Sequence, residues 1–362
     1  MQTQNSPFWT IPVLAFCLSL ILSLVLAPTL GLVAYQQYDF WLLWGISMLI
    51  LALPLMILEI ALAKRAKATP LQGFMQLTRD ADRSTKWRLV SWGAVLFVPF
   101  MVGGMLDFSA QQMQDQLGLS LHSSLMVLIL AVVAVALSCV PRLILLILMV
   151  LAMLGVVATG ILQAPTQHWQ WTAIEFHEWA KVVTLIMVTG GLGLGLYWQS
   201  ALQATKNNRS AAPVALPIWL AQVVGLGVFA FVNDIVSPMQ AGVLTLAVLA
   251  LAALLLQLVR AQLLERQIVL VLQVVVLLVP VLLWAIPHSA VVFYPVLVIC
   301  GLLLALLYAV FVGWLMKISH LRKAIQLPNE AIYNLWRMVV RIVIPLSVLL
   351  SLVGWIWVWL GA

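Results

Sequence analysis

Residues 52–65 read ALPLMILEIALAKR, an apolar run that holds one acid, Glu59, and ends in Lys64 and Arg65. The apolar part reaches back to Asp39, so it exceeds the about 20 residues that a membrane-spanning helix needs. A carboxylate in lipid is costly, and an intramembrane acid therefore points to a partner and a role. The sequence predicts a spanning helix built around one special acid.

The composition extends this prediction to the whole chain. Of 362 residues, 64% are hydrophobic and only 8% are charged, whereas soluble domains carry about 25% charged residues. The 16 Trp residues suit membrane–water interfaces. The formal charge of +7 does not indicate a nucleic-acid partner, because no basic cluster is interleaved with stacking aromatics. The three Cys residues lie in apolar segments, where we expect small hydrophobes and no disulfide. The expected partner of this chain is the lipid bilayer.

Eleven apolar stretches are long enough to span it, at 8–34, 39–63, 89–113, 121–140, 142–162, 179–203, 213–232, 239–259, 267–286, 290–316 and 338–361. If the N-terminus is cytoplasmic, alternating sides place every Lys and Arg except Lys181 inside, as the positive-inside rule requires. We therefore expect an all-α polytopic protein of about eleven transmembrane helices in the cell's inner (plasma) membrane, with an external C-terminus. Residues 324–337 form a partly amphipathic connector, expected to lie along the membrane.

Two spans carry helix-breaking residues at corresponding places. Residues 189–195 of the sixth span read TGGLGLG, and the first span has Pro28 and Gly31 near its end. These are the first helices of two five-helix halves, and matched interruptions are the best sequence indicator of a transporter's binding site. Interruptions free backbone groups that then need a partner. Alternatively, the glycines only allow close helix packing. The binding reading gives these candidate residues: Ser19, Ser23, Thr189, Gly190, Gly191 and Gly193.

Two acids inside spans have alternative readings. Glu59 is either a proton-coupling acid or a structural acceptor for N–H groups freed by the break in the sixth span. Asp107 lies about two helical turns beyond Pro99. It is either a site for a substrate amine or a proton, or an interfacial residue near external water. Four intramembrane glutamines are expected to hold helices together, namely Gln199, Gln222, Gln257 and Gln273.

The sequence favours no enzyme, cofactor or metal site. It has no Ser/His/Asp set, phosphate loop or CxxC pair, and its five His residues are scattered. Glu175, His177 and Glu178 lie close together, but in a loop and with spacing that is weak evidence for a metal.

Several pieces, in order along the chain, resemble the neurotransmitter:sodium symporter family. They include Leu53 to Met56 with Glu59 and the basic pair, then Thr69-Pro70 and Phe74, the stretch from Trp87 to Pro99, the Gly-rich sixth span followed by Tyr197, and the approach to the last span from Ala331 to Pro345. The resemblance implies the LeuT-type fold, a 5+5 inverted repeat. Residues 1–162 and 163–337 would be the two repeats and 338–361 an eleventh helix. It also implies the structural role for Glu59.

The departures from that family concern sodium. Anchored on Pro28, the family's sodium-binding Asn position is Ser23, its Arg position is Leu26, and its glycines are Leu20 and Leu22. The eighth span holds Thr245 as its only hydroxyl, where the family has a Thr/Ser pair. A hard cation needs several oxygen ligands, so sodium coupling of the usual kind is not expected.

Two functions fit these residues. One is a sodium-independent or degenerate carrier for an amino acid or similar small solute, with a carboxylate at the N–H groups of Gly190–Gly193 and an amine or proton at Asp107. The other is a non-transporting structural or regulatory subunit of a membrane complex. A carrier predicts a polar cavity in the middle of the membrane. A subunit predicts that side chains fill this region and that an outward apolar face docks a protein partner.

Overall fold

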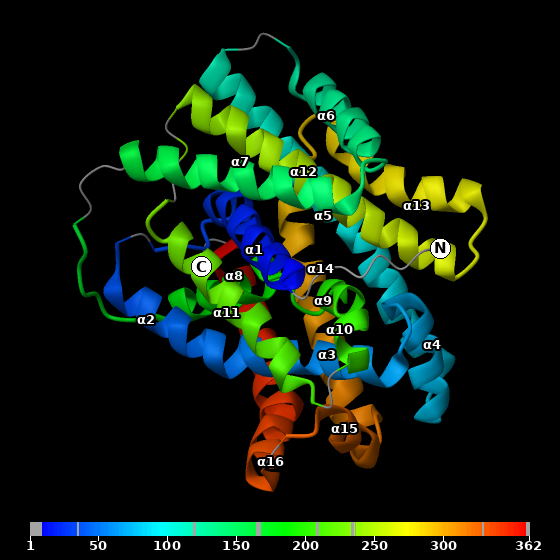
Figure 1. Ribbon diagram of the computed structural model, residues 1–362. Coiled ribbons are helices and arrows are strands. Elements are labelled where there is room, and N and C mark those ends of the chain that lie inside the picture. Colours follow the sequence, from blue (N-terminus) through cyan, green and yellow to red (C-terminus); the bar gives the residue numbers. More distant parts are fainter. Residues whose placement is uncertain are drawn as a thin grey trace.

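The computed structural model describes residues 9–34, 36–118, 121–163, 168–207, 210–232, 235, 237–327 and 329–359. Arg209 and the last residues of the eleventh expected span lie outside them. Within the described residues the chain is helical, and its extended backbone pairing is a single bridge between Gln37 and Gln170. Figure 1 shows the helices in one packed bundle, with the connector helices α15 and α16 together at one end.

The helices follow the apolar stretches closely. The first half contains α1 (Thr10–Thr29), α2 (Tyr38–Ser47) continuing through η1 (Met48–Ala52) into α3 (Leu53–Ala66), α4 (Pro70–Asp80), η2 (Thr85–Arg88), α5 (Leu89–Leu117), α6 (Ser123–Leu137) and α7 (Arg142–Gln163). The second half contains α8 (Phe176–Thr189), α9 (Leu196–Ser200), α10 (Leu202–Asn207), α11 (Ala212–Phe229), α12 (Pro238–Glu265), α13 (Leu270–Leu282) with η3 (Leu283–Ala285), and α14 (Ala290–Val310) with η4 (Phe311–Leu315). The chain ends with α15 (Ile318–Ile325), α16 (Glu330–Met338), η5 (Val339–Val343) and α17 (Ile344–Trp359).

The number of spans agrees with the sequence prediction. In the described part of the chain, 8 helices are long and apolar enough to cross a membrane. Two shorter apolar helices, Ser123–Leu137 and Leu270–Ala285, and the interrupted run from α8 to α10 bring the total to eleven. The chain is thus an all-α, multi-pass membrane protein.

Helix α1 occupies the centre of the bundle. Its residues 17–27 are buried on every side of the helix, as expected for a helix that is apolar all round. It packs against α11, α8, α7 and α5. By contrast, α7 and α13 leave large apolar side chains uncovered, such as Leu151 at 62% and Val271 at 75% exposed. These outer faces are suited to lipid, whereas α1 contacts only protein along most of its length.

Three of the four glutamines join separate helices. The Gln257 amide donates to the carbonyls of Ser138 and Val140, and Gln199 Nε2 donates to the Leu258 carbonyl. Gln222 bonds the residues around the interruption described below, whereas Gln273 donates to Ile268 just before its own helix. Such bonds satisfy polar groups where no water is present, which is the reason to expect them inside lipid.

The interruption expected in the first span does not occur. Helix α1 runs without a break from Thr10 to Thr29, and Pro28 and Gly31 only mark its end. The physical reason lies in residues 18–27, which read LSLILSLVLA and contain no glycine. Leucine favours the helix, and the two serine hydroxyls find acceptors on their own helix. The first and sixth spans therefore differ at this position.

The contact between α1 and α11 depends on Gly225. A Cβ placed there would lie 2.5 Å from Ser19 Oγ and 2.8 Å from the Phe16 carbonyl oxygen. We expect Gly225→Ala to lower the free energy of unfolding by about 1–3 kcal/mol, because overpacking forces these two helices apart. Gly227→Ala is the matched control in the same helix, since nothing lies within 4 Å of its Cβ position. The stability of both variants is measured in detergent as the temperature at which heating removes the monodisperse peak in size-exclusion chromatography. If the two substitutions lower this temperature equally, the close packing of α1 and α11 at Gly225 is contradicted.

The interrupted helix and the centre of the bundle

Helix α8 ends inside the bundle at a run of glycines. The N–H groups of Gly190, Gly191 and Leu192 donate to the carbonyls of Ile186, Val188 and Met187, closing the last turn of the helix. Gly191, Gly193 and Gly195 all have positive φ, between +62° and +77°. Only glycine adopts this backbone readily, which explains why three of them alternate with leucines here. Residues Gly190–Gly195 are called the break below.

Glu59 lies directly against the break. Its Oε1 accepts the Gly193 N–H at 2.7 Å, and its Oε2 accepts the Trp198 N–H at 3.3 Å. The side chain is 0% exposed. Both oxygens of one acid from α3 therefore bind backbone donors that the interrupted helix leaves without intrahelical partners. Of the two roles open for Glu59, the family resemblance implied the structural one, and the structure brings the acid and the break together.

The carbonyl side of the break is bound as well. The Gly190 carbonyl accepts bonds from the Tyr197 hydroxyl and from Gln222 Nε2, both at 2.8 Å. Gln222 Nε2 also lies 2.8 Å from the Tyr197 oxygen. Tyr197 was not among the sequence-predicted site residues, although a tyrosine two residues after the glycine run was the available signal. The backbone groups that a carrier would offer to a solute at Gly190–Gly193 are thus engaged by the protein itself.

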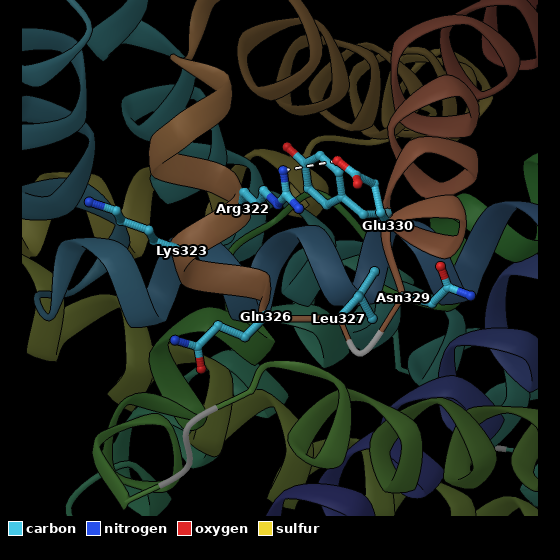
Figure 2. A pocket seen from close by; sticks show the side chains of 7 residues that line it. Arg322, Lys323, Gln326, Leu327, Asn329 and Glu330 are labelled. Carbon is cyan, nitrogen blue, oxygen red and sulfur yellow. Dashed lines mark ion pairs between the residues drawn. The ribbon is translucent and has the colours of Figure 1, made fainter.

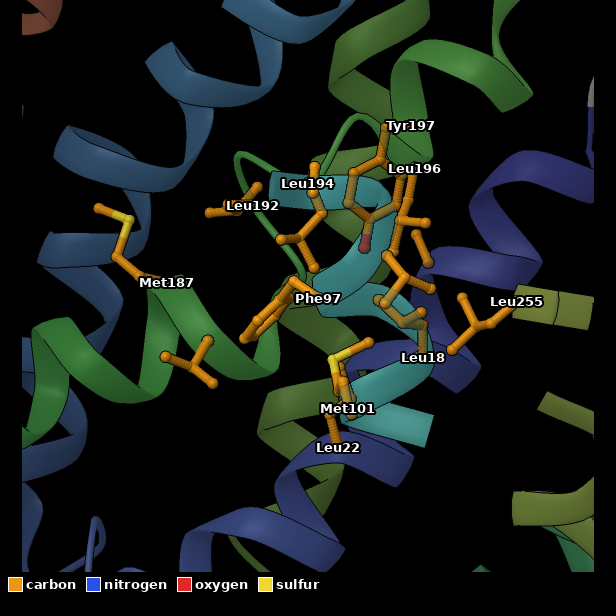
Figure 3. Close-up of a cluster of buried hydrophobic side chains, with 14 of the residues drawn as sticks. Leu18, Leu22, Phe97, Met101, Met187, Leu192, Leu194, Leu196, Tyr197 and Leu255 are labelled. Atoms are coloured by element: carbon orange, nitrogen blue, oxygen red, sulfur yellow. The ribbon is translucent and has the colours of Figure 1, made fainter. Parts of the chain in front are cut away.

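Hydrophobic side chains fill the space between the break and the neighbouring helices (Figure 3). Their exposed fractions are 6% or less, so no water-sized void lies against most of their surface. Leu18 comes so close to the break that a Cβ on Gly191 would lie 2.9 Å from its Cδ2. The cluster comes from α1, α5, α8, the break, α9 and α12, and contains Leu18, Leu22, Phe97, Met101, Met187, Leu192, Leu194, Leu196 and Leu255. This set is called the central plug below.

The predicted hydroxyl ligands do not converge on one cavity. Ser19 Oγ donates to the Phe16 carbonyl, Ser23 Oγ to the Ser19 carbonyl, and Thr189 Oγ1 to the Leu185 carbonyl. Ser19 also packs against Gly225 of α11. Each hydroxyl hydrogen is therefore used within its own helix, a pattern typical of Ser and Thr in apolar surroundings.

Asp107 belongs to a separate cluster. Its Oδ2 accepts a bond from Gln111 Nε2 at 2.8 Å and lies 3.3 Å from the Tyr294 hydroxyl of α14. The same hydroxyl lies 3.2 Å from the Gly104 carbonyl, and the Trp284 ring covers Gly104. Asp107 is only 4% exposed, so it is not a water-facing interfacial residue. None of the ion pairs in the described part of the chain includes it. Sequence reasoning missed Tyr294 and Trp284.

Gly193 is the position in the break that tolerates a side chain least. A Cβ there would lie 2.5 Å from the Ala305 Cα of α14, and its φ of +77° is already unfavourable for alanine. We expect Gly193→Ala to cost about 1–3 kcal/mol of backbone strain and a similar amount from the clash. Gly31→Ala is the control, because φ is +59° but nothing lies within 4 Å. Thermal unfolding of both variants gives the difference; a Gly31→Ala variant as unstable as Gly193→Ala contradicts the close approach of α14.

Comparisons with known proteins identify the fold. No family model matches the chain, and no curated protein matches its sequence. Among solved structures, the crystal structure of MhsT in complex with L-phenylalanine is similar to this chain with a TM-score of 0.59. The two sequences are 14% identical, and the match covers 94% of this chain and 98% of that one. At this identity the likeness shows the fold alone: the chain is a multi-pass membrane protein of the LeuT type.

Proposed function

We propose that the chain is a degenerate carrier: it has the scaffold of a small-solute transporter but serves as a non-transporting structural or regulatory subunit in the inner membrane. The central plug carries this proposal. Leu18, Leu22, Met101 and Leu255 lie where α1, α5, the break and α12 meet, and none of them is more than 1% exposed. A subunit predicts such a filled centre, whereas a carrier predicts a polar cavity.

The continuous α1 supports the same proposal. In carriers of this architecture, solute and ion sites lie at the midplane, and discontinuous helices supply their polar groups. Here α1 keeps its backbone bonds throughout, and the interrupted sixth span has Glu59, Tyr197 and Gln222 as its partners. A solute entering the centre must displace packed leucines and meets few free polar groups. In this proposal residues 1–162 and 163–337 are the two repeats, and 338–361 is the added helix.

A sodium-independent carrier is the second candidate, favoured by two buried polar features. Asp107 has no cationic partner in the described part of the chain, and Gln222 Oε1 is buried without a hydrogen-bond donor. In this alternative Asp107 takes an amine or a proton, and the plug rearranges around an apolar amino acid or a similar solute. Ser23 and the alanine-rich middle of α12 do not replace the sodium ligands of the resembling family.

One pair of experiments separates the two candidates. The purified full chain is screened by thermal shift against the twenty amino acids, with and without sodium, and a tagged chain is isolated from its native membrane at natural expression levels. The subunit proposal predicts no amino-acid shift and one stoichiometric membrane protein that co-purifies. A sodium-independent shift that Asp107→Asn removes, together with a chain isolated alone, supports the carrier and overturns the subunit.

A further inference from the structure

Helices α15 and α16 border an open pocket at one end of the bundle (Figure 2). Its volume is about 520 Å³, enough for a small polar group. The two helices are joined by a short connection and belong to the connector that the sequence predicts to lie along the membrane. The pocket is lined by Arg322, Lys323, Gln326, Leu327, Asn329, Glu330 and Tyr333.

The polar lining of this pocket is mainly cationic and rich in donors. Arg322 pairs with Glu330 at 3.1 Å, and both side chains are exposed, at 58% and 65%. Lys323 forms no ion pair in the described part of the chain, so the lining carries one positive charge in excess. Gln326 adds an amide group with two N–H donors. Guanidinium, ammonium and amide donors are the groups that bind a phosphate.

An uncovered apolar stripe begins directly beside the pocket. Ile332, Leu335 and Met338 follow each other at three-residue spacing along α16, and they are 46%, 60% and 55% exposed. Helix α16 continues through η5 into α17 as one candidate membrane span, Glu330–Trp357. The stripe therefore starts within one helical turn of Glu330, at the pocket's edge. The polar pocket and the apolar stripe thus lie next to each other, as the headgroup and the acyl chains do in a phospholipid.

The pocket lies on the side of the membrane where anionic phospholipids are expected. Nearly all Lys and Arg residues lie on the face that the positive-inside rule assigns to the cytoplasm, and the cytoplasmic leaflet attracts such residues through its anionic lipids. Arg341, further along the same span, stacks over the Trp314 ring at 4.0 Å, an aromatic–cation pair suited to the headgroup region. These features fit a pocket near the cytoplasmic surface of the membrane, where lipid phosphates lie.

We propose that the pocket between α15 and α16 binds the headgroup of one anionic phospholipid, whose acyl chains lie along Ile332, Leu335 and Met338. Arg322 and Lys323 attract the phosphate, and the Gln326 amide donates to it. Glu330 holds the Arg322 guanidinium in place. This site is distinct from the break and the central plug, and it does not depend on whether the chain transports a solute.

The test uses the purified full chain and native mass spectrometry with phosphatidylglycerol and phosphatidylcholine of identical acyl chains. Each cation near a lipid phosphate contributes about 1 kcal/mol, which corresponds to about fivefold in affinity, so we expect at least a fivefold preference for phosphatidylglycerol. The variant Arg322→Gln/Lys323→Gln should lose this preference. The control variant Arg79→Gln/Lys86→Gln, which removes two exposed charges outside the pocket lining, should keep it.

Three outcomes would contradict the lipid site. Equal binding of the two lipids, or a preference that survives in Arg322→Gln/Lys323→Gln, overturns the proposal. Inorganic phosphate is added as a competitor: phosphate that displaces the lipid at millimolar concentration identifies a site for the free anion, and so overturns the lipid assignment. If the double variant is unstable, Lys323→Gln alone is used, because it leaves the Arg322–Glu330 pair intact. This variant should show a reduced preference for phosphatidylglycerol, and an unchanged preference overturns the proposal.

Discussion

Replacing Glu59 by leucine is expected to destabilise the protein strongly. The change removes the acceptor of the Gly193 and Trp198 N–H groups, which lie 2.7 and 3.3 Å from the carboxylate oxygens, and leaves both donors buried. An unsatisfied buried donor costs about 1–3 kcal/mol, so the loss should be about 2–6 kcal/mol. Neither lipid nor water is at hand to replace the acid, because Glu59 is 0% exposed.

Two further variants show whether hydrogen bonding is the cause. Glu59→Gln keeps one acceptor oxygen at nearly the same volume, and it should lie between the native chain and Glu59→Leu in stability. Asp80→Asn changes an acid of the exposed Arg65–Asp80 pair, and a surface pair contributes about 1 kcal/mol at most. The stability of all three variants is ranked by the temperature at which half of the monodisperse peak in size-exclusion chromatography is lost. A Glu59→Leu chain as stable as the native protein contradicts the structural role of this acid.

The second large effect is expected at the central plug. Leu22 is 0% exposed in the middle of α1, and Leu22→Ala deletes three carbon atoms from the packed centre. Buried leucine-to-alanine changes cost about 2–5 kcal/mol, partly through the cavity that remains. The matched control is Leu151→Ala on α7, where the side chain is 62% exposed and faces outward. That control should cost well under half as much, since lipid refills its place.

The comparison also distinguishes a plug from a solute cavity. If the space beside Leu22 were a cavity that a solute occupies, truncating a lining side chain would change the affinity for that solute and leave stability nearly unaffected. A Leu22→Ala chain that unfolds at the same temperature as Leu151→Ala therefore contradicts the packed centre. The same heating assay serves for both variants.

The parts of this architecture that sequence could predict are those with local signals. The break is visible as alternating glycines at 191, 193 and 195, because positive φ requires them. Glu59 stands out because a lone acid in an apolar run is costly and therefore has a partner. The fold class followed from the length of the apolar runs, and the structure confirms an all-α membrane protein, with 8 helices in its described part long and apolar enough to cross a membrane.

The parts that sequence could not predict depend on packing between distant segments. The leucines of α1 read equally well as lipid-facing or as central, and only the bundle shows that they face protein. Pro28 suggested a break, yet it lies in the last turn of α1, where the helix ends at Thr29 in any case. The partner of Asp107, Tyr294, is 187 residues away in the sequence. Likewise the buried Asp39 meets Thr172 across 133 residues, a contact without a local signature.

The claim that the central plug closes the middle of the bundle is tested most directly by the accessibility of that region to a water-soluble thiol reagent. Leu22→Cys and Met101→Cys are made in a chain whose Cys17, Cys139 and Cys300 are replaced by alanine, and Asp115→Cys, in an exposed position near the end of α5, serves as the positive control. In native membranes we expect a charged methanethiosulfonate to label Asp115→Cys from the side of the membrane that exposes it, and to leave the two central positions unmodified when applied from either side. Labelling of Leu22→Cys or Met101→Cys that an amino acid prevents would show an open solute pathway through the centre and would contradict a non-transporting subunit.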